Sequence, residues 1–174
     1  MKRVFILLLL ALTFGAHGQA LTDQPGYVDF GELAGLGLEP QVEVSLGSAL
    51  IGFLAAAAQE EDPELATTLR RLRSIRLNVF ELPEQDVASV KARVNTLVST
   101  LKADAWEPAV SVKGEDATIH LYMKTVNDKV AGMTVMMIDS SGEAVFMNIV
   151  GEIDPAQLGK VAARFGVDAD IGLD

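Results

Sequence analysis

Four arginines stand close together in the middle of the chain, at Arg70, Arg71, Arg73 and Arg76. A guanidinium group presents a planar fork of N–H donors that matches carboxylate and phosphate oxygens, so such a cluster can grip an anionic partner or head group. Arginines at the end of a helix also complement its dipole, and Arg70 and Arg71 end a predicted helix. We predict that the four arginines form a contact surface for a protein partner, with this structural role as the alternative.

Five of the six methionines fall on three successive predicted strands, at Met123, Met133, Met136, Met137 and Met147. Methionine is flexible and polarizable, so a cluster of this kind can line a pocket for a hydrophobic small molecule or a lipid. Alternate residues of a strand point to opposite faces, which separates Met136 from Met133 and Met137. The candidate pocket is therefore Met123, Met133, Met137 and Met147, with the long helix over residues 83–102 beside them. Core filling and copper(I) capture by thioethers are the alternatives.

Catalytic and metal-binding patterns are poorly represented. The chain has no cysteine, which excludes disulfides, thiolate nucleophiles and zinc–cysteine sites, and His120 is its only histidine beyond residue 20. A Ser-His-Asp hydrolase would have to use His120, but strand alternation predicts that it points outward, and no Gly-x-Ser-x-Gly elbow is present. Asp168, Asp170 and Asp174 lack the glycine turn and closing glutamate of a calcium loop. We predict no catalytic residue, no metal and no cofactor.

Charge and composition narrow the class of protein further. The chain has 174 residues, of which 49% are hydrophobic, and its 24 acidic residues against 14 basic ones give a net charge of −10. An anionic body repels phosphate backbones, so a nucleic-acid-binding function is not expected. The hydrophobic share is sufficient for a folded core. The glycines match neither the Walker nor the dinucleotide-binding spacing.

The N-terminus has the three parts of a secretory signal: Lys2 and Arg3, an apolar run, and small residues before a cleavage point. Cleavage is expected after Ala20, with Gly18 as the alternative. The apolar run is shorter than the ~20 residues that span a bilayer. We expect an exported protein, periplasmic or secreted, without a membrane span in the mature chain. Its parts are then a signal peptide (1–20), an N-terminal arm (21–39), a single domain (40–166) and an acidic tail (167–174).

The elements that position these side chains follow from hydrophobic periodicity. Alternation and turn residues predict strands at 41–46, 74–82, 108–113, 118–125, 130–138 and 144–150. Apolar spacings of three and four, with capping residues, predict helices that begin at Ser48 and Pro63 and helices over 83–102 and 155–165. The arm is expected to hold at most one short helix, near residues 30–36. The order strand, helix, strand, helix, four strands, helix indicates an α+β fold: a mixed, mainly antiparallel sheet packed by helices.

Several segments resemble an uncharacterised family of small exported bacterial proteins that is catalogued as a domain of unknown function. They are Tyr27-Val28-Asp29-Phe30, residues 39–47, residues 72–80, Trp106-Glu107 and residues 145–155. The resemblance covers roughly residues 27–165. It implies export and assigns no activity, cofactor or catalytic residue. Genes of such proteins often lie near those of extracytoplasmic sigma factors, which suggests a role in envelope signalling.

The arginines and the resemblance together give the functional expectation. We expect a non-enzymatic exported domain that binds a protein of the cell envelope, with no nucleic-acid partner. The alternative is a binding module for a hydrophobic small molecule or lipid, and a hydrolase built around His120 is a third hypothesis. The oligomeric state stays open.

Overall fold

The structure is a computed structural model, and it describes residues 20–31 and 38–154. Four predicted parts lie wholly or mostly outside the described residues: the signal peptide except for Ala20, the helix over 155–165, the acidic tail and most of the short helix near 30–36. The elements in chain order are η1 (Leu21–Asp23), β1 (Val42–Gly47), α2 (Ser48–Ala57), α3 (Pro63–Arg71), β2 (Leu72–Glu81), α4 (Glu84–Ala103), β3 (Trp106–Lys113), β4 (Ala117–Val126), β5 (Lys129–Asp139) and β6 (Glu143–Ile153).

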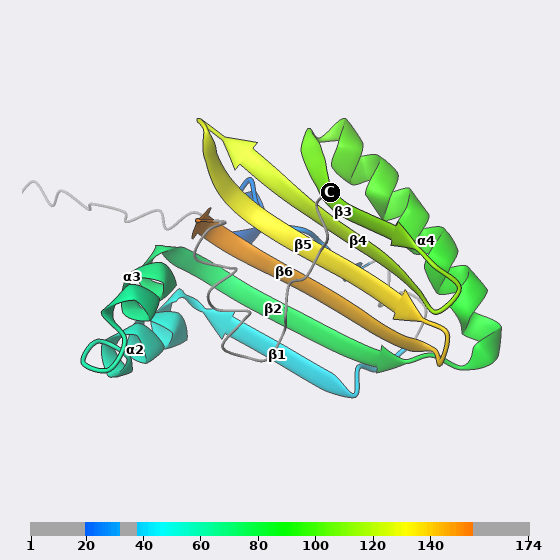
Figure 1. The fold of residues 1–174 in the computed structure, drawn as a ribbon, viewed down its shortest axis with the longest axis horizontal. Helices are drawn as coiled ribbons and strands as arrows, with labels where there is room; N and C mark the ends of the chain where they lie inside the picture. Colours follow the sequence, from blue (N-terminus) through cyan, green and yellow to red (C-terminus); the bar gives the residue numbers. More distant parts are fainter. Residues whose placement is uncertain (1–19, 32–37, 155–174) are drawn as a thin grey trace, which may run out of the picture.

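The strands form one six-stranded sheet in the order β1-β2-β6-β5-β4-β3 (Figure 1). After β2 the chain crosses through α4 to the far edge and returns strand by strand until β6 pairs with β2. The predicted α+β fold is confirmed. The sheet is antiparallel at every pairing rather than mixed. Tight turns account for the antiparallel pairings from β3 to β6.

Local sequence explains the boundaries of these elements. Asp62 caps α3, since its Oδ1 accepts a hydrogen bond from the Leu65 N–H at 3.0 Å, and Pro63 occupies the first turn. In the β5–β6 turn, Asp139 Oδ1 accepts from the Ser141 N–H and the Glu143 N–H, both at 2.9 Å. Hydrogen bonding, first from the Ser141 hydroxyl and then from these backbone groups, lowers the pKa of Asp139.

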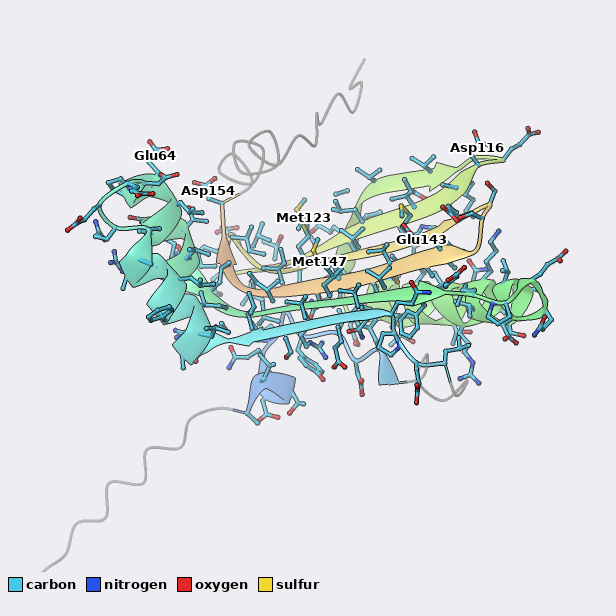
Figure 2. All side chains as sticks on the ribbon, turned by 90° about the horizontal axis from the view of Figure 1, so that it is seen from below. Glu64, Asp116, Met123, Glu143, Met147 and Asp154 are labelled. Carbon is cyan, nitrogen blue, oxygen red and sulfur yellow. The ribbon has the colours of Figure 1, made fainter. Side chains whose placement is uncertain are left out.

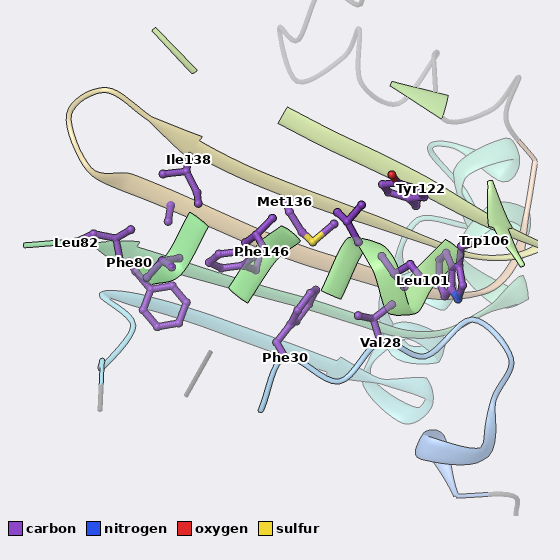
Figure 3. Packing of buried hydrophobic residues seen from close by; sticks show 14 residues of the cluster. Val28, Phe30, Phe80, Leu82, Leu101, Trp106, Tyr122, Met136, Ile138 and Phe146 are labelled. Carbon is purple, nitrogen blue, oxygen red and sulfur yellow. The ribbon is translucent and has the colours of Figure 1, made fainter. Parts of the chain in front are cut away.

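One face of the sheet, here called the helix face, carries Phe80, Tyr122, Met136, Phe146 and Asn148. Helix α4 packs on this face with a stripe of buried residues three and four apart, namely Val90, Val94, Val98 and Leu101. The N-terminal arm supplies Val28 and Phe30 to the same core (Figure 3). The arm is thus part of the core and not only a lead-in to the domain.

The opposite face, here called the methionine face, is apolar across the sheet except for Glu107 on the edge strand β3. Strand pairing aligns its side chains in three rows: Val42-Val79-Val145-Met137-Ile119-Val112, Val44-Leu77-Met147-Val135-Leu121-Val110 and Leu46-Ile75-Ile149-Met133-Met123-Glu107. Helices α2 and α3 lie at one end, where Ile51 and Leu69 join its cluster. In the part of the chain that the structure describes, no helix is both long and apolar enough to cross a membrane.

Candidate functional site

Three of the four predicted arginines surround one cavity at the end of the sheet where α3 meets β2. The cavity has a volume of about 450 Å³, and Arg70, Arg71 and Arg73 line it together with Lys129 and Glu152. The arm closes one side through Gln24 and Pro25. We call this site the cationic pocket. All four of its basic residues are exposed, so their charged groups are accessible to a ligand.

Glu152 is the carboxylate of the cationic pocket. Its side chain lies 2.9 Å from Lys129 Nζ and 3.8 Å from Arg71 Nη1. The hydrogen bond from Lys129, and then the charges of Lys129 and Arg71, lower the pKa of Glu152. Four cations against one anion leave this lining with a net charge of three positive units. A second anionic group would therefore find unneutralised partners there.

Arg76 does not line the cationic pocket, so the structure does not bring all four predicted arginines together. Its half-buried guanidinium lies on the helix face, where it donates to the Val28 carbonyl and, at 3.2 Å, to the Tyr27 hydroxyl. It also stacks on the Tyr27 ring at 4.2 Å. Alternation explains the difference, because residues 73 and 76 are an odd number apart on β2 and a bulge follows Leu72. Arg76 holds the arm.

The four methionines predicted to share a pocket lie on one face. Met123, Met133, Met137 and Met147 all belong to the methionine face, and Met136 lies on the helix face, as alternation predicts. Figure 2 shows Met123 and Met147 on the side of the sheet opposite α4. The expectation that the long helix lines a pocket with them is therefore wrong.

His120 is buried, not directed outward into solvent as the alternation predicted. Only 3% of it is exposed, because α4 covers its face of the sheet. Burial, and then the charges of Lys113 and Lys102, lower the pKa of His120. Its Nδ1 lies 3.4 Å from Ser111 Oγ, and its Nε2 has no hydrogen-bond partner among the described residues. No carboxylate orients the ring, so the described residues form no Ser-His-Asp arrangement.

Sequence reasoning missed Lys129, Glu152 and Asn148. Lys129 and Glu152 reach the cationic pocket only through the pairing of β6 with β2 and β5, which local patterns do not reveal. Asn148 left a readable signal, since it is a polar residue inside the apolar run from Val145 to Val150. A buried amide of this kind needs hydrogen-bond partners.

Within the described ranges, no three acidic or histidine side chains gather as a metal site would require.

A family model described as a domain of unknown function, DUF4252, matches residues 39–161. The chain belongs to the DUF4252 family. The resemblance to an uncharacterised family is confirmed, and the family description names no activity or ligand. No curated protein matches the chain. The DUF4252 region includes all six strands and helices α2 to α4, whereas residues 20–31 of the arm precede it.

Proposed function

We propose that this DUF4252 domain is a non-enzymatic binding domain that recognises an acidic segment of a cell-envelope protein through the cationic pocket. The supporting observation is the convergence of Arg70, Arg71, Arg73 and Lys129 on one cavity with Glu152 as its carboxylate. The chain as a whole carries a net charge of −10, which repels acidic partners at long range. Attraction therefore depends on this local concentration of cations, and bidentate arginine contacts add geometric selectivity.

The export of the chain and the envelope location of its partner are part of this proposal. They rest on the signal-like first twenty residues and on the resemblance stated for the family. An envelope-signalling role fits a small domain with an exposed charged pocket, because such a pocket can bind and release a partner reversibly.

The first test measures binding of a fluorescent octaglutamate peptide by anisotropy, with octaglutamine as the neutral control. We expect saturable binding of the acidic peptide that weakens between roughly 0.05 and 0.5 M salt. The double variant Arg71→Glu/Arg73→Glu should lose at least about tenfold in affinity, because two bidentate contacts become repulsive. The matched control is Lys91→Glu/Lys102→Glu, which reverses two exposed charges on α4 and so changes the net charge by the same amount. Equal loss in both variants would assign the binding to net charge and reject the pocket.

A second test identifies the partner in cells that make the protein naturally. A photo-crosslinking residue at position 70 should trap a protein through an acidic segment, and the same residue at position 91 should not. Equal crosslinking at both positions would contradict recognition by the cationic pocket.

The second candidate function is binding of a hydrophobic small molecule or lipid on the methionine face. Its support is the three rows, which are apolar except for Glu107 at one end. Met133 and Ile149 are 8% exposed there, and the edge residues Val42 and Val112 are 46% and 43% exposed. A fluorescent fatty acid should bind the full chain, and Met147→Lys should abolish that binding while the size-matched Met147→Leu keeps it. Binding unaffected by Met147→Lys would reject this candidate.

A further inference from the structure

Side chains of the sheet bind the arm through hydrogen bonds to its backbone. The Val28 N–H donates to Asn148 Oδ1 at 3.0 Å, and Asn148 Nδ2 donates to the Gly26 carbonyl at 2.9 Å. These two groups flank Tyr27, and they are the pair that a neighbouring parallel strand would bind. Arg76 adds a bond to the Val28 carbonyl. The Asn148 amide and the Arg76 guanidinium thus bind backbone groups of the arm that a paired strand would otherwise bind.

The side chains of the arm also make specific contacts with the sheet. Val28 and Phe30 are 3% and 7% exposed, and the Phe30 ring packs on Phe146 with centroids 5.8 Å apart. Tyr27 lies under the Arg76 guanidinium. Three side chains of the arm, those of Tyr27, Val28 and Phe30, therefore each occupy a different set of contacts on the helix face.

The first position of this segment is restricted to glycine. A Cβ atom on Gly26 would lie 2.1 Å from the Ala131 carbonyl oxygen, and one on Gly132 would lie 2.3 Å from the Gly26 Cα. Two backbones approach here more closely than any side chain permits. The contact surface thus selects the pattern Gly-aromatic-Val-x-Phe.

Asn148 and Arg76 also make hydrogen bonds that do not involve the arm, because Arg76 donates to Asn148 Oδ1 at 3.1 Å. Asn148 also donates to the Met133 carbonyl at 3.1 Å, which fixes the amide from within the sheet. Arg76, Gly132, Phe146 and Asn148 all fall inside residues 39–161, the region matched by the family model, and the arm segment 26–30 lies outside it.

We infer that Arg76, Asn148, Gly132 and Phe146 form a peptide-binding site, occupied in this chain by its own residues 26–30. Its ligand class is a peptide of the pattern Gly-aromatic-Val-x-Phe. The site binds the same segment when it is supplied as a separate peptide. This inference differs from the proposed function, because Arg76, Asn148, Gly132 and Phe146 lie outside the lining of the cationic pocket and bind backbone groups and apolar side chains rather than an acidic segment.

The test uses the full chain from Leu21 with residues 32–37 replaced by a protease cleavage sequence, so that cutting leaves every part present. A labelled peptide of residues 21–31 is then added in excess. We expect the peptide to replace the cut arm in a saturable manner, detected by anisotropy. Absence of exchange, with the cut arm permanently retained, would overturn the inference, and so would unfolding of the protein on cutting.

Two sets of variants decide whether the exchange uses this site. A peptide with Gly26→Val should bind at least about tenfold more weakly than the native peptide, and this variant leaves the protein unchanged. Asn148→Leu in the cut protein should reduce affinity by at least about tenfold, with Asn95→Leu on the exposed surface of α4 as the matched control. If Asn148→Leu fails to fold, the Gly26→Val peptide alone decides.

Equal binding of the native and Gly26→Val peptides would overturn the inference. The variants also separate it from the proposed function. Arg71→Glu/Arg73→Glu should leave binding of the 21–31 peptide within about twofold of the unaltered protein, whereas the octaglutamate peptide should be sensitive to it. Loss of 21–31 peptide binding in that variant, together with equal binding of the native and Gly26→Val peptides, would place the peptide in the cationic pocket and reject the site on the helix face.

Discussion

The two faces of the sheet bury their side chains by different means. The helix face places polar groups with no exposed surface, such as Asn148 and Thr134, among aromatic rings. The methionine face carries only apolar side chains in its rows, apart from Glu107 at one end. Hydrogen bonds are directional, so few arrangements satisfy a buried amide, whereas apolar contact is not directional. The helix face therefore fixes the arm in one register, whereas the methionine face can pack against apolar groups of different shapes.

The largest expected effect comes from removing the amide that organises the helix face. Asn148→Leu leaves the Val28 N–H and the carbonyls of Gly26 and Met133 without that partner. We expect the free energy of unfolding in urea to fall by about 3 to 5 kcal/mol, since each buried unsatisfied group costs about 1 to 3 kcal/mol.

The neighbouring Met147 supplies the control for that comparison, because it points to the methionine face. Met147→Leu should cost less than about 1.5 kcal/mol, as volume-conserving apolar changes generally do. Similar losses for Asn148→Leu and Met147→Leu would contradict the difference between the faces.

The next effect concerns the close approach of the arm to the sheet. Gly132→Ala would place a Cβ 2.3 Å from the Gly26 Cα, so the arm must move. We expect a loss of about 1 to 3 kcal/mol in the free energy of unfolding. The control is Gly52→Ala in α2, where a Cβ meets nothing within 4 Å, and alanine should stabilise that helix by about 0.5 to 1 kcal/mol. Chemical denaturation of both variants would show whether the sign differs as expected.

A smaller effect is the dependence of stability on pH, through His120. Its pKa in the folded protein is lowered, so the folded state binds fewer protons than the unfolded state once the pH falls below the usual histidine value of about 6.5. Stability from the neutral ring is therefore complete above that pH and is lost as the pH falls toward the folded-state pKa. The slope from one proton cannot exceed about 1.4 kcal/mol per pH unit.

His120→Gln tests this dependence directly. The variant should show a flatter profile of unfolding free energy between roughly pH 7 and 5 than the unaltered protein. Lys91, Lys102 and Lys113 should be kept in both proteins, since two of them act on the pKa of His120 and the third lines the small cavity beside it. Identical profiles would show that His120 does not contribute.

Much of the fold could be predicted from sequence because its signals are local. Apolar patterns and turn residues together identified all six strands, and Asp62-Pro63 identified the start of α3. The odd spacing of Arg73 and Arg76 also contained the information that they point to opposite faces of a strand, although a cluster of like residues suggested one surface.

The sites depend on information that no local pattern contains. Lys129 lies 56 to 59 residues from Arg70 and Arg73 in sequence, and only the insertion of β6 between β2 and β5 brings the three together. Alternation along its strand predicts that His120 points into solvent. In the structure most residues on both faces of β4 are buried or half-buried. Which face α4 covers is decided by packing between distant elements, not by periodicity.

The smallest effect on stability is expected at the cationic pocket. There a substitution should change the affinity for an acidic ligand much more than the free energy of unfolding. Glu152 pairs with Lys129 and Arg71 while all three remain exposed, and exposed ion pairs contribute little to folding. Glu152→Gln should therefore leave the free energy of unfolding within experimental error. The same change removes the carboxylate that competes with an incoming acidic ligand, so octaglutamate should bind severalfold more tightly. Glu143→Gln, at the other end of β6, controls for net charge. If both variants tighten binding equally, the gain comes from the reduced overall charge, and Glu152 does not act within the pocket.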